Sequence, residues 1–104
     1  MLVMNYEFKR GFFFVRLSGK ISSYNYNSFL MELDNIIIKT GLNKVVININ
    51  NVKNMGSEYM NKILNYIKKC SKKNILIFLC DSNTIIGDND ILKINNEREV
   101  YNYI

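Results

Sequence analysis

The chain has 104 residues, of which 48% are hydrophobic and 22% are charged; these values exclude a disordered chain and predict one domain, residues 1–104, with its own core. Its net charge of +5 comes mainly from lysine, and Lys68, Lys69, Lys72 and Lys73 cluster around one expected helix end. Cations there complement the helix dipole, whereas nucleic-acid surfaces favour interleaved arginine and aromatic residues, so we expect no nucleic-acid partner.

The first expected element is a β-hairpin. Apolar side chains alternate at Leu2, Met4, Tyr6 and Phe8, and a β-rich run follows at residues 12–17. Gly11 can adopt the positive φ that the turn between these runs needs. The side chains of the second strand alternate, so that one face holds Phe13, Val15 and Leu17 and the other holds Phe12, Phe14 and Arg16.

Both faces of this second strand are apolar. If Phe12 and Phe14 face outward, they form a patch that favours a homodimer or a partner contact. The alternative is that a terminal segment or a helix covers them, as is usual for large aromatic residues. The sequence leaves both alternatives open.

Two helices and two buried strands are expected next. Ser22 or Ser23 can cap the first helix, because a hydroxyl satisfies an amide at its open start, and Gly41 ends it. Residues 44–49 form a β-branched run typical of a central strand, and residues 50–56 form a loop. A second helix spans residues 57–71, and an apolar strand spans residues 74–80. Apolar positions recur at helical spacing in both helices: Phe29, Leu30, Leu33, Ile36 and Ile37, then Met60, Ile63, Leu64, Ile67 and Cys70.

The C-terminal part is predicted to hold only short elements. Residues 81–90 are polar and leave room for a short helix around residues 84–86, and residues 91–94 can form an edge strand. Asn96 can cap a final helix with a small apolar face. The order β-β-α-β-α-β-(short α)-β-α predicts an α/β fold with a mixed sheet and helices mainly on one face. The apolar face of the final helix comprises Val100, Tyr103 and Ile104.

The residue types that common catalysis needs are missing. No histidine occurs, which removes the most frequent general base and a main zinc ligand. The glycines are isolated, so no phosphate-binding loop is indicated, and the acidic run at residues 88–90 lacks the ligand set of a calcium loop. Cys70 and Cys80 have no paired spacing and are expected to be plain buried thiols. We therefore predict no enzyme, no metal and no cofactor.

The sequence carries no sign of export or membrane insertion. No apolar stretch approaches the length that crosses a bilayer, and residues 1–7 lack the basic and long apolar regions of a signal peptide. We expect a cytoplasmic protein with no membrane partner.

Two segments and the order of the elements resemble the STAS family, which is named for sulphate transporters and anti-sigma factor antagonists. Residues 12–21, FFFVRLSGKI, resemble the family's second strand and its following L-x-G-x-(I/L)-(D/S) turn. Residues 44–52, KVVININNV, resemble its central strand, K-x-V-V-(I/L)-D-(L/I)-S-x-V. The resemblance covers essentially the whole chain and implies a single STAS-like domain of the bacterial anti-sigma factor antagonist type.

The family's regulatory motif is expected at the start of the second helix. It typically reads (I/M)-D-S-(S/T)-G, and its second hydroxyl residue accepts a phosphate. Here Gly56 stands at the Asp, Ser57 at the first Ser, Glu58 at the phosphoacceptor and Tyr59 at the Gly. The resemblance therefore implies a degenerate motif whose switch is lost, or one whose switch has moved to Ser57. The second alternative requires a kinase that accepts a shifted hydroxyl with no neighbouring Asp.

The resemblance implies a non-catalytic regulator that binds an anti-sigma factor/serine kinase, or a related ATPase-fold protein, and so controls sigma-factor-dependent transcription. The alternative is a STAS subunit of another assembly, a stress-signalling complex or a lipid-transport ATPase, which needs no phosphorylation. Residues 81–90 are shorter than the helix that members usually carry there, which leaves the partner's identity open. The implied docking residues are Asn54, Met55, Gly56, Ser57, Glu58, Tyr59 and Asn61.

Overall fold

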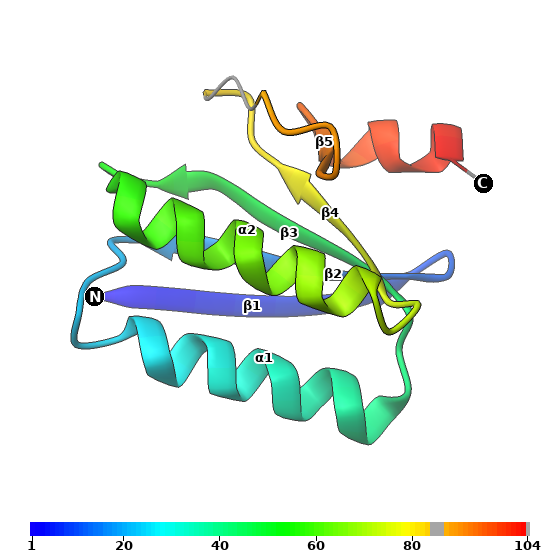
Figure 1. Ribbon diagram of the computed structural model, residues 1–104, viewed down its shortest axis with the longest axis horizontal. Coiled ribbons are helices and arrows are strands. Elements are labelled where there is room, and N and C mark those ends of the chain that lie inside the picture. The colour runs from blue at the N-terminus through cyan, green and yellow to red at the C-terminus, as the bar shows by residue number, and fades with distance from the viewer. Residues whose placement is uncertain (84–86, 104) are drawn as a thin grey trace.

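A five-stranded mixed sheet with helices on both faces forms the protein, and the computed structural model describes residues 1–83 and 87–103. The strand order is β1-β2-β3-β4-β5, with β1 antiparallel to β2 and the other neighbours parallel. Figure 1 shows the two long helices and the short C-terminal helix around this sheet, and the predicted α/β fold is confirmed. The elements are β1 (Leu2–Lys9), β2 (Phe12–Gly19), α1 (Tyr26–Thr40), β3 (Lys44–Val52), α2 (Ser57–Ser71), β4 (Leu76–Cys80), β5 (Leu92–Ile94) and the 3-10 helix η1 (Glu97–Tyr103).

The predicted hairpin is present, and its two-residue turn explains its register. Arg10 and Gly11 both have positive φ, 52° and 86°, which is the geometry of turns that match the twist of the flanking strands. Strand β2 runs two residues further than expected, because it pairs with the end of β3 as far as Gly19. Gly19 has a φ of 100°, and a Cβ there would clash with the carbonyl oxygen of Met1. Only glycine fits this position.

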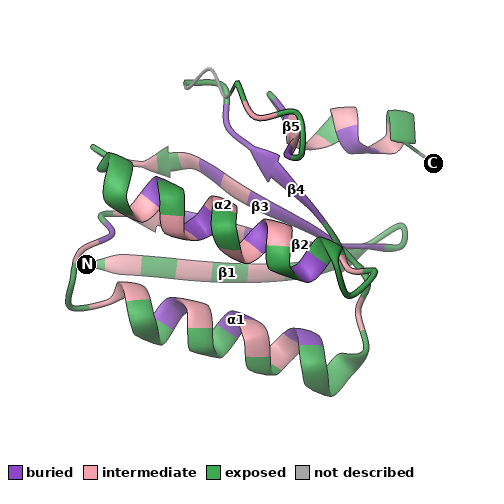
Figure 2. Ribbon diagram, viewed as in Figure 1, coloured by how far each residue is buried: buried purple, intermediate pink, exposed green. Residues whose placement is uncertain are grey.

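The larger apolar cluster lies between the sheet and the helices α1 and α2. Side chains of β2, β3 and β4 alternate, so that every second residue points to this side. Four of the five apolar positions predicted for α2 are buried, and Leu64 is half-buried; Figure 2 shows separate buried segments, in purple, along this helix. The fully buried members include Val15, Leu33, Ile47, Ile63 and Leu79.

A second, smaller cluster fills the opposite face of the sheet. Phe12 and Phe14 are only 3% and 2% exposed there, because η1 packs over them with Val100 and Tyr101. The Tyr101 ring meets both phenylalanine rings edge-on, at centroid distances of 5.7 and 6.5 Å. The expectation of an outward apolar patch is therefore wrong, and the alternative of a covering terminal segment is confirmed. The possible homodimer was inferred from this outward patch, so the reason for expecting it no longer holds.

An ion-pair network ties η1 to the sheet. The Arg16 guanidinium donates to both carboxylate oxygens of Glu97 at 2.8 Å and contacts Glu7 at 2.8 Å on its other side. The Asn48 side chain also donates to Glu97, at 2.8 Å. The Arg16 hydrogen bonds, with help from Asn48, hold the pKa of Glu97 below its ordinary value. Glu97 is therefore a charged anchor for the segment that covers the second face.

The start of α1 differs from the sequence expectation. The helix begins at Tyr26, after a turn, rather than directly behind Ser22 or Ser23. Asn25 occupies the N-cap but makes no side-chain cap bond, because its Oδ1 accepts from the backbone N–H of Ser22 and so points backwards. The end of the helix is as predicted: Gly41, with a φ of 66°, donates to the Ile37 carbonyl.

The C-terminal half of the chain also differs from the sequence expectation. Strand β4 begins at Leu76 rather than at residue 74, because Asn74 has a φ of 63° and belongs to the turn that ends α2. The final helix is a 3-10 helix, in which the Glu99 N–H donates to the Asn96 carbonyl three residues back. The short helix expected around residues 84–86, and Ile104 of the final apolar face, lie outside the described residues.

Candidate functional site

The segment that joins β3 to α2 gathers all the predicted docking residues at one helix start. Asn54 has a φ of 53°, and Gly56 is extended, so the chain turns sharply before α2 begins. Gly56, not Ser57, is the N-cap, and Ser57 is the first helical residue. Helix α2 therefore spans Ser57–Ser71, as the sequence predicts. The residues brought together are Asn54, Met55, Gly56, Ser57, Glu58, Tyr59 and Asn61.

Most of this segment is exposed, and Glu58 is its most prominent charge. The Glu58 side chain is 71% exposed and lies 3.9 Å from the Lys62 ammonium, a distance that makes only a weak surface ion pair. The backbone amide of Met60 is bonded to the Gly56 carbonyl at 3.0 Å, so the amides of residues 57–59 precede the helical ladder. A negative charge in this first turn is of the sign that the helix dipole favours.

Two residues beside this segment were not anticipated from the sequence. The Tyr26 ring, at the start of α1, lies 5.7 Å from the Tyr59 ring, and the Lys62 ammonium lies 4.5 Å above the Tyr26 ring. The surface therefore continues from α2 onto α1. The four-residue spacing of Glu58 and Lys62 could have indicated their contact, but no local pattern places Tyr26 next to α2.

A hollow of about 290 Å³ lies beside the docking segment, where β3 and β4 end. Its walls include Val52, Met55 and Met60, and its polar side includes Asp81 and Asn83. Asp81 is 2% exposed although it is charged in water at neutral pH. Sequence reasoning did not suggest this burial.

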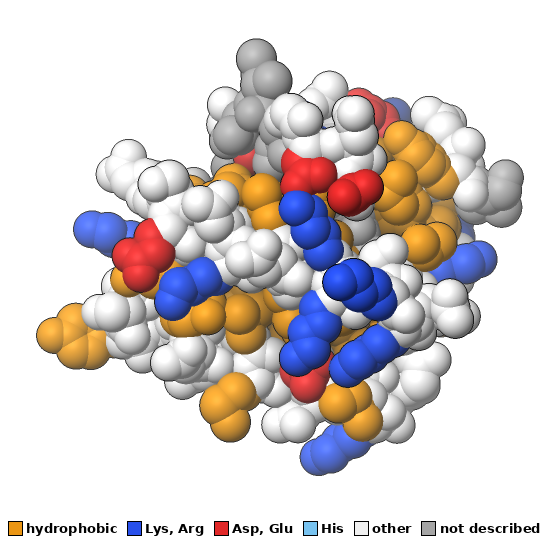
Figure 3. All heavy atoms as spheres, viewed as in Figure 1, with side chains coloured by type: hydrophobic (Ala, Val, Ile, Leu, Met, Phe, Trp, Pro, Cys, Tyr) orange, Lys and Arg blue, Asp and Glu red, His pale blue; other side chains and the backbone are white. Residues whose placement is uncertain are grey.

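The lysine cluster predicted at the end of α2 is present, and Figure 3 shows its blue side chains gathered there. A hollow of about 390 Å³ lies among Lys68, Ser71, Lys72 and Asp90. Lys68 forms an ion pair with Asp88. The hydrogen bond between these two side chains lowers the pKa of Asp88 and raises the pKa of Lys68. Within the part of the chain that the structure describes, no group of three or more potential ligands could hold a metal ion.

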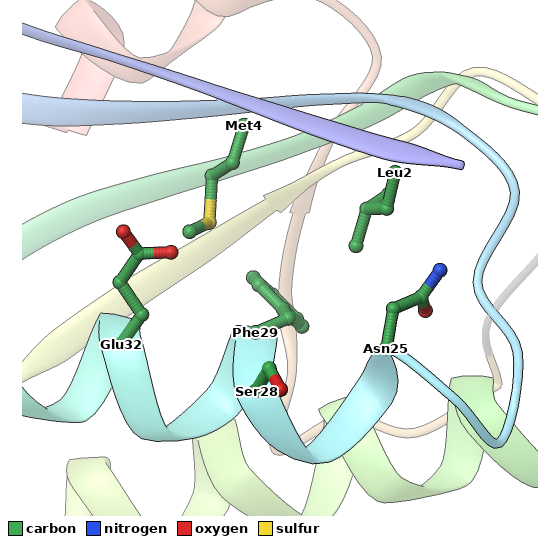
Figure 4. Close-up of a pocket in the computed structure, with 6 residues that line it drawn as sticks. All are labelled: Leu2, Met4, Asn25, Ser28, Phe29 and Glu32. Atoms are coloured by element: carbon green, nitrogen blue, oxygen red, sulfur yellow. The ribbon is translucent and has the colours of Figure 1, made fainter.

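A further hollow, of about 230 Å³, lies between the edge strand β1 and α1 (Figure 4). Leu2 and Met4 point from β1 towards the helix, and Phe29 points up from the helix between them. Asn25 and Glu32 stand at its two ends, so its chemistry is mixed and carries no concentrated charge. None of the residues predicted for docking lies in it.

Both cysteines are buried, and they form no disulfide. Burial raises the pKa of the Cys80 thiol to about 11, and burial also raises the pKa of Cys70. Such thiols stay protonated at neutral pH and are poor nucleophiles, which fits the expectation of plain buried cysteines. In the described ranges, 1–83 and 87–103, no helix is long and apolar enough to cross a membrane.

Comparison with known families identifies the class of this fold. The STAS domain profile matches residues 3–87, and the chain belongs to the STAS domain family. No curated protein sequence matches it. The fold is the one seen in solved structures of anti-sigma factor antagonists.

Three solved structures are similar to this chain. The unphosphorylated anti-sigma factor antagonist SpoIIAA superposes with a TM-score of 0.68 at 12% identity, covering 97% of this chain and 96% of that one. A candidate anti-sigma factor antagonist from Thermotoga maritima gives a TM-score of 0.81 at 15% identity, covering 96% and 92%. The protein Mglu gives 0.66 at 20% identity over 79% of this chain, which spans only 20% of the length of Mglu.

Proposed function

We propose that this chain is a non-catalytic regulatory module that docks on a partner protein through the start of α2. The partner is an anti-sigma factor/serine kinase or a related ATPase-fold protein, and binding controls sigma-factor-dependent transcription in the cytoplasm. STAS membership supports this proposal, as does a fold shared with anti-sigma factor antagonists. The observation that carries it is the exposed start of α2, where Gly56, Ser57 and Glu58 are all exposed.

Glu58 determines how this surface is regulated. A phosphate at the equivalent position would carry about −1.5 to −2 charges at neutral pH and could be removed, whereas Glu58 carries about one permanent charge. Glu58 lies in the first turn of α2, where the helix dipole favours a negative charge by about 0.3–1 kcal/mol. We therefore expect the surface to be held in one charge state, without the usual serine phosphoswitch.

The permanent charge has two consequences that binding can distinguish. Glu58 either mimics a phosphorylated, released state or faces a partner that has adapted to bind it. A carboxylate has about half the charge of a phosphate and fewer acceptor oxygens, so its mimicry is incomplete. Ser57 is exposed beside it and is the remaining hydroxyl of the motif, so its phosphorylation has to be tested directly.

Phosphorylation by the organism's own anti-sigma kinase is the test. Wild type, Glu58→Ser and the matched control Glu58→Ala are incubated with the kinase and ATP, and mass spectrometry locates the phosphate. We expect none on the wild type or on Glu58→Ala, and phosphate at position 58 of Glu58→Ser only. Robust phosphorylation of wild-type Ser57 would show that the switch has moved by one residue and would contradict our reading of the motif.

Titration calorimetry with the same kinase tests the docking surface itself. Asn61→Asp, within the proposed surface, is expected to weaken binding, whereas Asn102→Asp, exposed on η1, is expected to leave it unchanged. If neither the wild type nor Glu58→Ser binds the kinase, the proposal fails. The alternative of a STAS subunit in a stress-signalling complex or a lipid-transport ATPase would then take its place.

A further inference from the structure

The end of the molecule opposite the docking segment is formed by the hairpin tip and by the C-terminal ends of both long helices. Lys9 pairs with Phe12 and Lys44 pairs with Leu76, so β1 ends where β2, β3 and β4 begin. Helix α1 leads into β3 and α2 leads into β4, so both helices end there too, as Figure 1 shows. With 15 residues, α2 separates this end from the docking segment by about 22 Å.

Exposed cations are concentrated at this end, which we call the basic end. Its exposed cations are Lys9, Arg10, Lys39, Lys44, Lys69, Lys72 and Lys73. These seven residues are half of the 14 lysines and arginines of the chain, and Figure 3 shows some of them as blue side chains around the end of α2. None forms an ion pair with an acid in residues 1–83 and 87–103.

The helix dipoles and the acids near the helix ends do not balance this charge. Each helix C-terminus carries about half a negative charge, so the two helices together offset about one of the seven cations. Asp88 is already paired with Lys68. Asp34 on α1, and Asp90 in the hollow with Lys72, offset two more. The basic end therefore keeps an excess of about four positive charges, which an anionic partner would neutralise.

Exposed apolar side chains lie among these cations. Phe8 is at the hairpin tip and Ile38 is in the last turn of α1, and their exposed fractions are 61% and 67%. Leu76, which pairs with Lys44, is exposed as well. At a membrane, such side chains enter the boundary between lipid headgroups and acyl chains, while lysine ammonium groups stay among the headgroups.

The kinds of residue at the basic end favour a lipid surface over other anionic partners. Six of its seven cations are lysines. Lysine is depleted at protein–protein interfaces, and nucleic-acid surfaces favour arginine with stacking aromatic residues. Anionic lipids, in contrast, attract clusters of lysine through the surface potential of the membrane, without a fixed geometry for each contact.

We propose that the basic end binds an anionic membrane surface, with its lysines among the headgroups and Phe8 inserted at their boundary with the acyl chains. The expectation of no membrane partner rested on the lack of a spanning or export segment, which a surface contact does not need. The docking segment lies at the other end of α2, so it stays accessible on the bound protein. The inference does not depend on which partner docks there.

Vesicle sedimentation with the wild-type chain is the first test. The vesicles contain phosphatidylcholine alone or phosphatidylcholine with about 30% phosphatidylglycerol, which supplies the negative surface potential. We expect the chain to partition at least about tenfold more strongly onto the anionic vesicles. This preference should fall severalfold when the salt concentration is raised from about 0.1 M to about 0.5 M, because salt screens the attraction.

Matched lysine pairs test whether the basic end makes the contact. The double variant Lys72→Gln and Lys73→Gln should weaken partitioning by about fivefold for each lysine removed. The double variant Lys20→Gln and Lys53→Gln removes the same charge at exposed positions where β2 and β3 end, and it should partition nearly as the wild type does.

A fluorescent probe tests the insertion of Phe8. The chain has no tryptophan, so a single introduced one reports on its own surroundings. The emission of Phe8→Trp should shift to shorter wavelength when anionic vesicles are added. The emission of Tyr24→Trp, at an exposed aromatic position just before α1, should not shift.

The proposal is overturned if the wild type binds neutral and anionic vesicles equally, or if both lysine pairs cause the same loss. It is also overturned if the Phe8→Trp emission stays unshifted on bound vesicles. Equally tight binding of polyglutamate or duplex DNA at the same charge concentration would assign the basic end to a soluble polyanion instead. The comparison of vesicles uses the wild type, so it remains decisive even if a variant does not fold.

Discussion

Among single residues, the Arg16–Glu97 pair makes a prediction with a defined pH dependence. Glu97→Gln is expected to lower the free energy of unfolding by about 1 kcal/mol at neutral pH, since it breaks a bidentate pair while Arg16 keeps its contact with Glu7. The pKa of Glu97 in the folded state lies below its ordinary value of 4.5, so the unfolded state binds the proton more tightly. The stabilising contribution of the charged Glu97 side chain is therefore fully present at pH values above 4.5, and it is lost as the pH falls through the folded-state pKa of Glu97.

Urea unfolding at several pH values measures this effect. The difference between wild type and Glu97→Gln should be constant near neutrality and should shrink as the pH is lowered from about 5 towards about 3. Asp90→Asn serves as the control, because this exposed residue forms no ion pair with Arg16 or with any other described residue. A difference that stays the same over the whole range would show that Glu97 acts through packing and not through its charge.

Among the elements, η1 matters most for stability, because it packs over one face of the sheet and buries the apolar side chains there. Val100 is fully buried against Phe12 and Phe14, and removing this contact would expose both rings. Val100→Asp is expected to lower the free energy of unfolding by at least about 3 kcal/mol, because it buries an unpaired charge or displaces the helix. Displacement would create the apolar patch that the native protein lacks, and with it self-association.

Sedimentation velocity and binding of a hydrophobic dye distinguish these outcomes. Val100→Asp should bind more dye than the wild type and sediment as a larger species at high concentration. Asn102→Asp, which adds the same charge on an exposed position of the same helix, should behave like the wild type. If Val100→Asp is folded, monomeric and unchanged in dye binding, η1 does not act as the cover that we describe.

At the scale of the whole molecule, the two apolar clusters lie on opposite faces of the same strands, and they should therefore unfold together. Ile63→Ala in the larger cluster should cost about 2–5 kcal/mol and Val100→Ala in the smaller one about 2 kcal/mol. Both variants should shift one common transition, measured by circular dichroism and by tyrosine fluorescence. A separate early transition in Val100→Ala alone would mean that the C-terminal segment is a distinct unit and that the single-domain expectation fails.

The sequence by itself determined the elements whose signal is local. The alternation of β1, the turn at Gly11, the stripe of α2 and the glycine that ends α1 each follow from backbone geometry, which a few neighbouring residues specify. It also placed the motif segment, residues 54–61, at the start of α2. The N-cap of α1 was mistaken because Ser22, Ser23 and Asn25 can all make a capping bond, and the choice depends on how the turn folds back.

Only the tertiary structure decided which surfaces meet. An apolar strand face shows that something must cover it, but the sequence of β2 does not say that η1 covers Phe12 and Phe14. The contact between Tyr26 and Tyr59, and the burial of Asp81 beside Met55, likewise join residues from different elements. Local periodicity fixes which side of an element is apolar, whereas the packing of elements far apart in the chain fixes what that side touches, and the candidate hollow exists only through such packing.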